Sequence, residues 1–308
     1  MKSPEVTIIV PIYNGSAYLL ETLNSLLSQT FRNFELLAID DGSTDSSGDL
    51  VRTLKDERVR LIQRDNGGLC EALNLGIAEA KAPYIVRTDQ DDISLPERLE
   101  RQLQVIEDSP QAVAVFAHSI KFGRKHYWSN NDKLIMAKGQ LKDYDPAEDG
   151  CVLYSTMLAR TAVLRSIGGF RQTYYPADDL DFECRLSQTG RVLILREPLV
   201  GYRFQTSANT YRVFADMREK SHWAMNSYRR RLQGLPELTL EQFRLGQAKD
   251  LWSRVGRHGQ DESKLHMRLA GQRYLDGRYL GAAGHLIRAI LNDPLDIARR
   301  IKRHFSHL

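Results

Sequence analysis

The chain has 308 residues, of which 42% are hydrophobic and 27% are charged. This composition excludes a disordered chain and a collagen-like repeat, and three widely spaced cysteines exclude a disulfide framework. No apolar run approaches the ~18 residues that a membrane span needs, and no leader with a cleavage site follows the first residues. We therefore expect a cytoplasmic protein with reduced thiols.

The formal net charge of +4 is unevenly distributed along the chain. Residues 211–308 hold 19 Lys and Arg against 10 Asp and Glu, whereas residues 1–210 hold 24 against 29. Such asymmetry indicates that the two parts meet different partners. We expect a first domain over 1–210 and a basic region over 211–308.

Strands and helices alternate over the first 122 residues. Apolar, β-branched runs predict strands at 6–12, 34–40, 59–65, 83–89 and 111–122. Between them, helical spacing of apolar residues predicts helices after Asn14-Gly15, near 48–56, after 66–68 and over 97–108. This alternation predicts an α/β fold with a mostly parallel sheet flanked by helices.

The pattern changes after residue 122. Residues 123–150 are irregular and polar, and short helices are predicted at 160–170 and 179–190. The last predicted strand covers 191–204. Beyond 210 we expect helices throughout, interrupted near 234–236 and at Pro294, with a helical hairpin formed by 265–275 and 279–291.

Polar residues follow four consecutive predicted strands. In open parallel sheets, ligands bind outside the carboxyl ends of the strands, so these residues predict one connected site. The residues in question are Pro11, Tyr13 and Asn14, then Asp40 and Asp41, then Asn66, Gly67 and Gly68, and finally Asp89, Gln90, Asp91 and Asp92.

The sequence TDQDD at 88–92 is the strongest local signal. Asp89 and Asp91 offer hard oxygen ligands to Mg²⁺ or Mn²⁺ and leave coordination positions free for phosphate oxygens. The alternative is a solvated acidic turn, in which Asp92 caps the helix that Pro96 opens.

Two further turns admit a ligand or a purely structural interpretation. Asp40 and Asp41 can contact a base or ribose, or form a plain Asp-Gly turn with Gly42. Gly67 and Gly68 allow close backbone approach, with helix N-terminal amides facing an anion. Neither the GxGxxG nor the GxxxxGK[ST] spacing is present, which disfavours Rossmann and P-loop sites.

A second acidic cluster comprises Asp178, Asp179, Asp181 and Glu183. Acids in the first turn of a helix are favoured by the macrodipole, which is the structural interpretation. The functional interpretation is a general base that accepts the proton of an attacking hydroxyl. No Ser/His/Asp order and no zinc spacing accompanies the cluster.

Together these residues resemble the family 2 glycosyltransferases with the GT-A fold, over roughly residues 5–207. The resemblance rests on 6–45, on 65–102, on IGGF at 167–170, on ADDLDFECRL at 177–186 and on GYRF at 201–204. It implies a GT-A domain, which the helical appendage predicted beyond residue 210 follows. It also implies inverting transfer of one sugar from a nucleotide-diphosphate sugar, a UDP- or dTDP-sugar, to an acceptor hydroxyl.

The resemblance assigns roles to particular residues. It implies that Asp89 and Asp91 bind a divalent cation, Mn²⁺ or Mg²⁺, and that Asp179 is the general base, with Asp178 in place of a usual Glu. Pro11, Tyr13 and Asp40 fall at the nucleoside, with Asp41, Asn66, Gly67 and Gly68 beside them, and Gln90 and Arg203 complete the expected donor site.

One departure from the family pattern leaves alternatives open. Gln205 stands where many relatives carry a His near the diphosphate. A catalytically silent nucleotide-sugar-binding or scaffolding protein is therefore the alternative hypothesis. A nucleotidyltransferase is a third, against which the missing Gly-rich N-terminal loop argues.

The basic region predicts charged surfaces at Arg229–Arg231 and at 298–305. Ile297, Ile301 and Phe305 share one helical face among arginines, which suits anionic lipid headgroups or packing on the domain. No recognition motif indicates nucleic acid. We expect a glycan or lipid-linked acceptor in cell-surface glycan assembly (lipopolysaccharide, O-antigen or capsule), at the inner face of the membrane.

Overall fold

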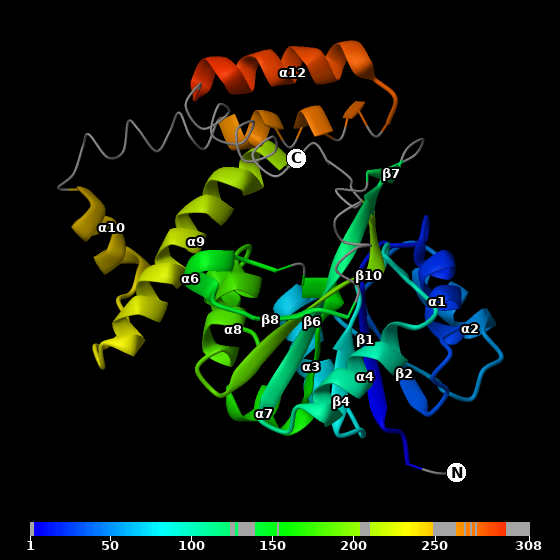
Figure 1. Cartoon of the computed structure of the whole chain (residues 1–308). Coiled ribbons are helices and arrows are strands. Elements are labelled where there is room, and N and C mark those ends of the chain that lie inside the picture. The colour runs from blue at the N-terminus through cyan, green and yellow to red at the C-terminus, as the bar shows by residue number, and fades with distance from the viewer. Residues whose placement is uncertain are drawn as a thin grey trace. The chain divides into compact units, whose positions relative to one another are not determined.

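The computed structural model describes residues 3–123, 127–128, 139–152, 154–203, 210–248 and 263–293, the last range without 268, 272 and 275 (Figure 1). The chain divides into two compact units. The first comprises Met1–Lys121 and Ser129–Arg203, and the second comprises Phe122–Trp128 and Phe204–Leu308. The basic segment 298–305 and Gln205 lie outside the described residues, so the predictions made for them stay predictions.

The first part of the chain confirms the expected alternation of strands and helices. Its elements are β1 (Val6–Ile12), α1 (Leu19–Leu27), β2 (Phe34–Asp41), α2 (Ser47–Thr53), β3 (Val59–Arg64), α3 (Leu69–Glu79), β4 (Tyr84–Arg87), β5 (Ile93–Ser94), α4 (Arg98–Asp108) and β6 (Ala112–Phe122).

The elements between residues 127 and 203 are mostly shorter. They are β7 (Tyr127–Trp128), β8 (Leu141–Asp143), α6 (Pro146–Asp149), η1 (Tyr154–Thr156), β9 (Leu158–Arg160), α7 (Thr161–Ser166), η2 (Gln172–Tyr174), α8 (Asp178–Leu186) and β10 (Arg191–Arg203). The strand β9 was not predicted, because three residues directly before a helix carry too little periodicity to be recognised as a strand.

The central sheet has the order β3-β2-β1-β4-β9-β6-β10-β5. The α/β class is confirmed, and the ladders among β3, β2, β1 and β4 are parallel. In contrast, β9 is antiparallel to both β4 and β6, and β10 is antiparallel to β5 and β8. The parallel part is therefore smaller than the sequence pattern indicated, because β9 inserts between β4 and β6.

The sheet is covered on both faces. Alternate residues of β1 point to opposite sides: Ile8 packs in a cluster with Leu23 of α1 and Leu99 of α4. Ile9 packs on the other side with Leu73 of α3 and with residues of α7 and α8. Because each fully buried aliphatic side chain contributes about 1.5–3 kcal/mol, these two layers fix the strand ends that carry the site.

Apart from Phe122 at the end of β6 and the short strand β7, the described residues of the second unit are mainly helical, as expected beyond residue 210. It contains α9 (Thr210–Leu232), α10 (Leu240–Ala248), helical residues within 263–274, and α12 (Tyr279–Asn292). None of the described helices is long and apolar enough to cross a membrane.

The arginine run at the end of α9 has a structural role. Arg230 Nε donates to Pro236 O at 2.6 Å, and Arg231 forms an ion pair with Glu237. The indole Nε1 of Trp223 donates to Leu238 O at 2.7 Å. Two of the three arginines predicted to form a charged surface thus bind the turn that follows their own helix.

Gly76 offers a test of the close packing between α3 and β1. A Cβ atom at this position would lie 2.6 Å from Cγ2 of the buried Ile9. We expect Gly76→Ala to lower the free energy of unfolding by about 1–3 kcal/mol, because the core must shift to admit the methyl group. Thermal and urea unfolding measure this change.

The matched control is Gly246→Ala in α10, where no atom of the described residues lies within 4 Å of the added Cβ. There the substitution should stabilise the helix by about 0.5–1 kcal/mol. Equal effects of the two substitutions would contradict the packing described for Gly76.

Candidate active site

A pocket of about 430 Å³ opens at the carboxyl ends of β1, β2 and β4, beside the start of α3. Its volume is typical of a site for a small organic ligand. Eight of the residues predicted from the sequence line it: Pro11, Tyr13, Asp41, Asn66, Gly68, Asp89, Gln90 and Asp91. The structure therefore brings together residues from four separate segments of the sequence.

Gln90 joins the ends of β1 and β4. Its side-chain Oε1 accepts a hydrogen bond from Tyr13 N at 2.9 Å, and its Nε2 donates to Tyr13 O at 3.1 Å. A Cβ atom on Gly15 would lie 2.2 Å from Gln90 Oε1, so the close approach depends on glycine. Gln90 thus fixes the backbone of Tyr13, whose side chain remains half exposed at the pocket.

Asp41 anchors the loop that begins α3. Its carboxylate accepts hydrogen bonds from Gly67 N at 3.1 Å and from Gly68 N at 2.8 Å, and Arg64 Nε lies 3.3 Å from Oδ1. The two glycine amides, which the sequence suggested for an anionic ligand, therefore bind a carboxylate of the protein itself. Gly68, the N-cap residue of α3, has a φ of 92°, a conformation that favours glycine.

Asp40 lies outside the pocket lining and closes the Asp-Gly turn, so its expected contact with the donor stays a prediction. It is buried, and its carboxylate accepts hydrogen bonds from Ser43 N and from Gln63 Nε2, both at 3.0 Å. Gly67 is likewise absent from the lining. These two residues shape the loops next to the site.

The acidic pair Asp89 and Asp91 lines the pocket directly after β4. The guanidinium of Arg87, which is almost fully buried, pairs with Asp89. Burial and the neighbouring Asp89 carboxylate raise the pKa of Asp91 to about 6. Negative charge is therefore unfavourable at Asp91 until a cation compensates it.

The residues present fit a cation that the protein shares with a ligand. Within the described residues no group of three or more His, Cys, Asp or Glu side chains could hold a metal ion. Two carboxylates alone suit Mg²⁺ or Mn²⁺ only when phosphate oxygens and water complete the coordination shell. Asp89 and Asp91 at the pocket wall meet that description.

The loop that carries these acids is held by two arginines. Arg98 is fully buried and donates to Thr88 Oγ1 and Ser94 Oγ, each at 2.9 Å. Arg203 Nε donates to Asp91 O at 2.9 Å, and its backbone N donates to Asp92 Oδ1 at 3.0 Å. Arg203 lies outside the pocket lining and acts on the loop.

Asp92 does not cap a helix. The helix α4 begins at Arg98 without a side-chain cap, and Asp92 instead accepts its hydrogen bond from Arg203 N. Burial and the Asp89 carboxylate raise the pKa of Asp92 to about 7. The capping interpretation was wrong because Asp92 belongs to the buried junction of β5 and β10.

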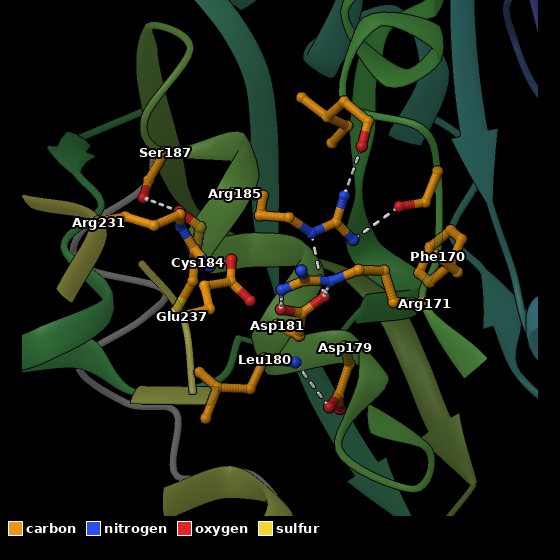
Figure 2. Close-up of polar contacts among 12 residues, drawn as sticks. Phe170, Arg171, Asp179, Leu180, Asp181, Cys184, Arg185, Ser187, Arg231 and Glu237 are labelled. Atoms are coloured by element: carbon orange, nitrogen blue, oxygen red, sulfur yellow. Dashed lines mark hydrogen bonds and ion pairs between the residues drawn. The ribbon is translucent and has the colours of Figure 1, made fainter. Parts of the chain in front are cut away.

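Three of the four acids at α8 are buried inside the protein. Asp181 is fully buried and binds both Arg171, with Nε to Oδ2 at 2.9 Å, and Arg185, at 3.0 Å (Figure 2). Arg185 also donates to Gly169 O at 2.6 Å. Glu183, equally buried, accepts a hydrogen bond from Tyr144 OH at 2.7 Å.

Asp179 differs from its neighbours because it is partly exposed. Its Oδ1 accepts from Leu180 N at 2.7 Å, as Figure 2 shows, and its Oδ2 accepts from the thiol of Cys151 at 3.2 Å. Asp178 is buried, and burial together with the Asp179 carboxylate raises its pKa to about 6. Asp179 is not part of the pocket lining, so its catalytic role stays a prediction.

Five lining residues were not identified from the sequence: Ile12, Leu69, Ala72, Gln172 and Tyr175. Gln172 and Tyr175 form the pocket wall between the IGGF turn and α8. They lie in an irregular segment with no periodic pattern. Their position shortly before the acidic cluster was the only available signal.

Comparisons with known proteins agree with this geometry. The model of the family "Glycosyl transferase family 2" matches residues 7–168. The putative glycosyltransferase EpsE of Bacillus subtilis is 30% identical over 224 residues, which are 68% of this chain and 77% of that protein. Glycosyltransferase GlyG of Streptococcus pneumoniae serotype 4 is 38% identical over 113 residues, 36% of this chain. That match covers 38% of GlyG, and the chain spans less than two thirds of several curated relatives.

Solved structures show the same fold. TarS 1-349 of S. aureus in complex with UDP-GlcNAc has a TM-score of 0.59 at 17% identity, covering 94% of this chain and 89% of that one. The mannosyltransferase PcManGT of Pyrobaculum calidifontis, in complex with GDP-Man and Mn²⁺, has a TM-score of 0.57 at 18% identity, covering 99% and 81%. At these identities the likeness confirms the GT-A architecture alone.

The buried carboxyl of Asp178 predicts a pH dependence of stability. Its folded pKa of about 6 lies above the ordinary value of 3.8, so the folded chain binds this proton more tightly than the unfolded chain. Stability from this group is present at low pH and is lost as the pH rises from about 4 to above 6. We expect Asp178→Asn to gain about 1–3 kcal/mol at pH 8 relative to wild type.

Urea unfolding of both proteins at pH 4.5 and pH 8 measures this difference. At pH 4.5 only part of this stability has been lost, so Asp178→Asn should gain clearly less than at pH 8, which makes the lower pH an internal control. A gain of equal size at both pH values would exclude a charged, buried Asp178.

Proposed function

The chain belongs to glycosyl transferase family 2, and on that premise we propose that it transfers a single sugar from a nucleotide-diphosphate sugar to an acceptor hydroxyl with inversion. The observation that supports the proposal is that one pocket is lined by Tyr13, Asp41, Asp89 and Asp91 together. It combines an aromatic and polar end with an acidic pair, which suits a nucleoside at one end and a cation-bound diphosphate at the other.

The donor proposed is a UDP- or dTDP-sugar. Pro11 and the half-exposed ring of Tyr13 give the nucleobase an apolar surface, and Asn66 supplies an amide nearby. One solved relative is bound to UDP-GlcNAc and another to GDP-Man, so the fold accommodates different bases.

Asp89 and Asp91 would hold Mn²⁺ or Mg²⁺ together with the diphosphate of the donor. A divalent cation bound there supplies charge stabilisation for the departing diphosphate. The side chains of Arg98, Arg203 and Gln90 hold the loop Asp89–Asp92 through hydrogen bonds. The two carboxylates are therefore positioned before the donor binds.

Asp179 is the proposed general base. A carboxylate near the acceptor accepts the hydroxyl proton while the oxygen forms its bond to the anomeric carbon and the bond to the diphosphate breaks. The exposure of Asp179 supports this role, because Asp178, Asp181 and Glu183 are buried. A single displacement inverts the anomeric centre and needs no nucleophile from the protein.

The acceptor proposed is a glycan or lipid-linked hydroxyl in the assembly of cell-surface glycan, at the inner face of the membrane. The excess of Lys and Arg over residues 211–308 supports contact with an anionic partner there. The reaction itself is defined by the donor site and is tested first.

Donor and cation binding can be tested by thermal shift. UDP-, dTDP- and GDP-sugars are added with Mn²⁺ or with a chelator, and a donor at 100 times its dissociation constant should add about 2.7 kcal/mol of stability. We expect this gain to require Mn²⁺ and to be lost in Asp91→Asn. Stabilisation of equal size in the presence of chelator would contradict the proposed cation.

The base is tested by Asp179→Asn. The variant should bind donor normally but transfer sugar about 10²–10⁴-fold more slowly, because an amide cannot accept the proton. Calorimetry measures donor binding, and release of nucleotide diphosphate measures turnover.

The matched control is Asp181→Asn, two residues along the same helix. It removes the partner of two arginines and should cost about 3–5 kcal/mol of stability. Transfer at the wild-type rate by Asp179→Asn would refute the base, and absence of turnover by the wild type across donors and acceptors would favour a silent binding protein.

A further inference from the structure

The helix α12 exposes its large aliphatic side chains. Leu280 is 92% exposed, Ile287 is 59% exposed and Leu291 is 77% exposed, whereas the small Ala289 is fully buried. An amphipathic helix of a globular protein normally buries its large apolar residues against the core. In α12 the arrangement is reversed.

The exposed residues form one continuous strip. Leu280, Ile287 and Leu291 are spaced seven and four residues apart, which places them on one side of a helix of 3.6 residues per turn. Leu286 and Ile290, also exposed, lie beside them. A contiguous apolar strip on the surface is typical of an interaction site.

The opposite side of α12 packs within the second unit. His285 Nδ1 lies 3.0 Å from His266 Nδ1, in the helical residues that precede α12, and Figure 1 shows the two segments side by side. A Cβ atom on Gly281 would lie 2.9 Å from the side chain of Arg273. The hairpin therefore holds α12 by one side and presents the aliphatic strip on the other.

The exposed charged residues beside the strip are arginines, whereas Asp276 before the helix and Asp293 at its C-cap are partly buried. The helix Tyr279–Asn292 contains no Asp or Glu and one arginine, Arg288, which is exposed, and exposed Arg278 immediately precedes it. Exposed Tyr274 and Tyr279 pack edge to face at 5.7 Å beside them. Aliphatic residues bordered by arginines and by aromatic rings with polar tips are typical of helices that lie in a bilayer interface.

We propose that α12 is a membrane-interface helix, with its aliphatic strip inserted among the lipids and Arg278 and Arg288 at anionic headgroups. A second copy of the chain fits less well, because a symmetric contact brings the arginines of both copies to the same interface. The arginine run at the end of α9 is not part of this membrane contact, since Arg230 and Arg231 bind the turn that follows α9.

Vesicle flotation of the full chain tests the proposal. Vesicles of phosphatidylcholine alone are compared with vesicles that also contain phosphatidylglycerol. We expect binding to the anionic vesicles that weakens with salt, and a loss of more than about tenfold in the variant Leu280→Glu/Ile287→Glu/Leu291→Glu. Arg288→Gln should weaken binding about fivefold.

The matched control is Leu245→Glu in α10, since Leu245 is 65% exposed in the same unit. It should bind vesicles like the wild type. Leu280→Glu alone provides a second variant if the triple substitution disturbs folding, which circular dichroism reveals. Donor-induced thermal stabilisation should be unchanged in all these variants, so this test is independent of the proposed reaction.

Three results would overturn the proposal: no binding of the wild type to anionic vesicles, wild-type binding by the α12 variants, or an equal loss in Leu245→Glu. If light scattering instead shows concentration-dependent self-association that the triple variant abolishes, without vesicle binding, the occupant of the strip is a second copy.

Discussion

A fully buried arginine supports the acidic loop on which the site depends. Arg98 donates hydrogen bonds to groups on both sides of Asp89–Asp92, and burial lowers its pKa to about 9. A buried guanidinium is costly unless its donors are satisfied, and here Thr88, Ser94 and the carbonyl of Arg87 satisfy them. The loop is thereby rigid where Asp89 and Asp91 need fixed positions to share a cation with a phosphate.

Neighbouring carboxylates in this protein differ in their contacts, and the residues around each one decide those contacts. Asp41 lines the pocket while Asp40 closes a turn, and Asp179 is partly exposed while Asp181 binds two arginines in the interior. The adjacent residues share a chemical type, so their environments alone distinguish them. The raised pKa of Asp178 shows that this arrangement also costs stability near neutral pH.

The basic second unit uses its arginines in two ways. Arg230, Arg231 and Arg244 bind partners within the unit, at Pro236, Glu237 and Glu219. Arg278 and Arg288 instead border the aliphatic strip of α12. Net charge alone therefore overstates the positive surface that a partner would meet. The distribution of exposed apolar residues is the better guide to where a partner binds.

The sequence by itself determined the strands β1 to β4, the helices between them and the residues at their carboxyl ends. It could do so because continuous apolar runs and helical spacing are local patterns, and because parallel strands bring their ends to one edge of a sheet. Only the tertiary structure decided that β9 is antiparallel between β4 and β6, that Gln172 and Tyr175 complete the pocket, and that Gln90 and Arg203 act on the backbone of the loops. Those outcomes depend on contacts between residues far apart in the chain, and such contacts leave no periodic signal in the sequence.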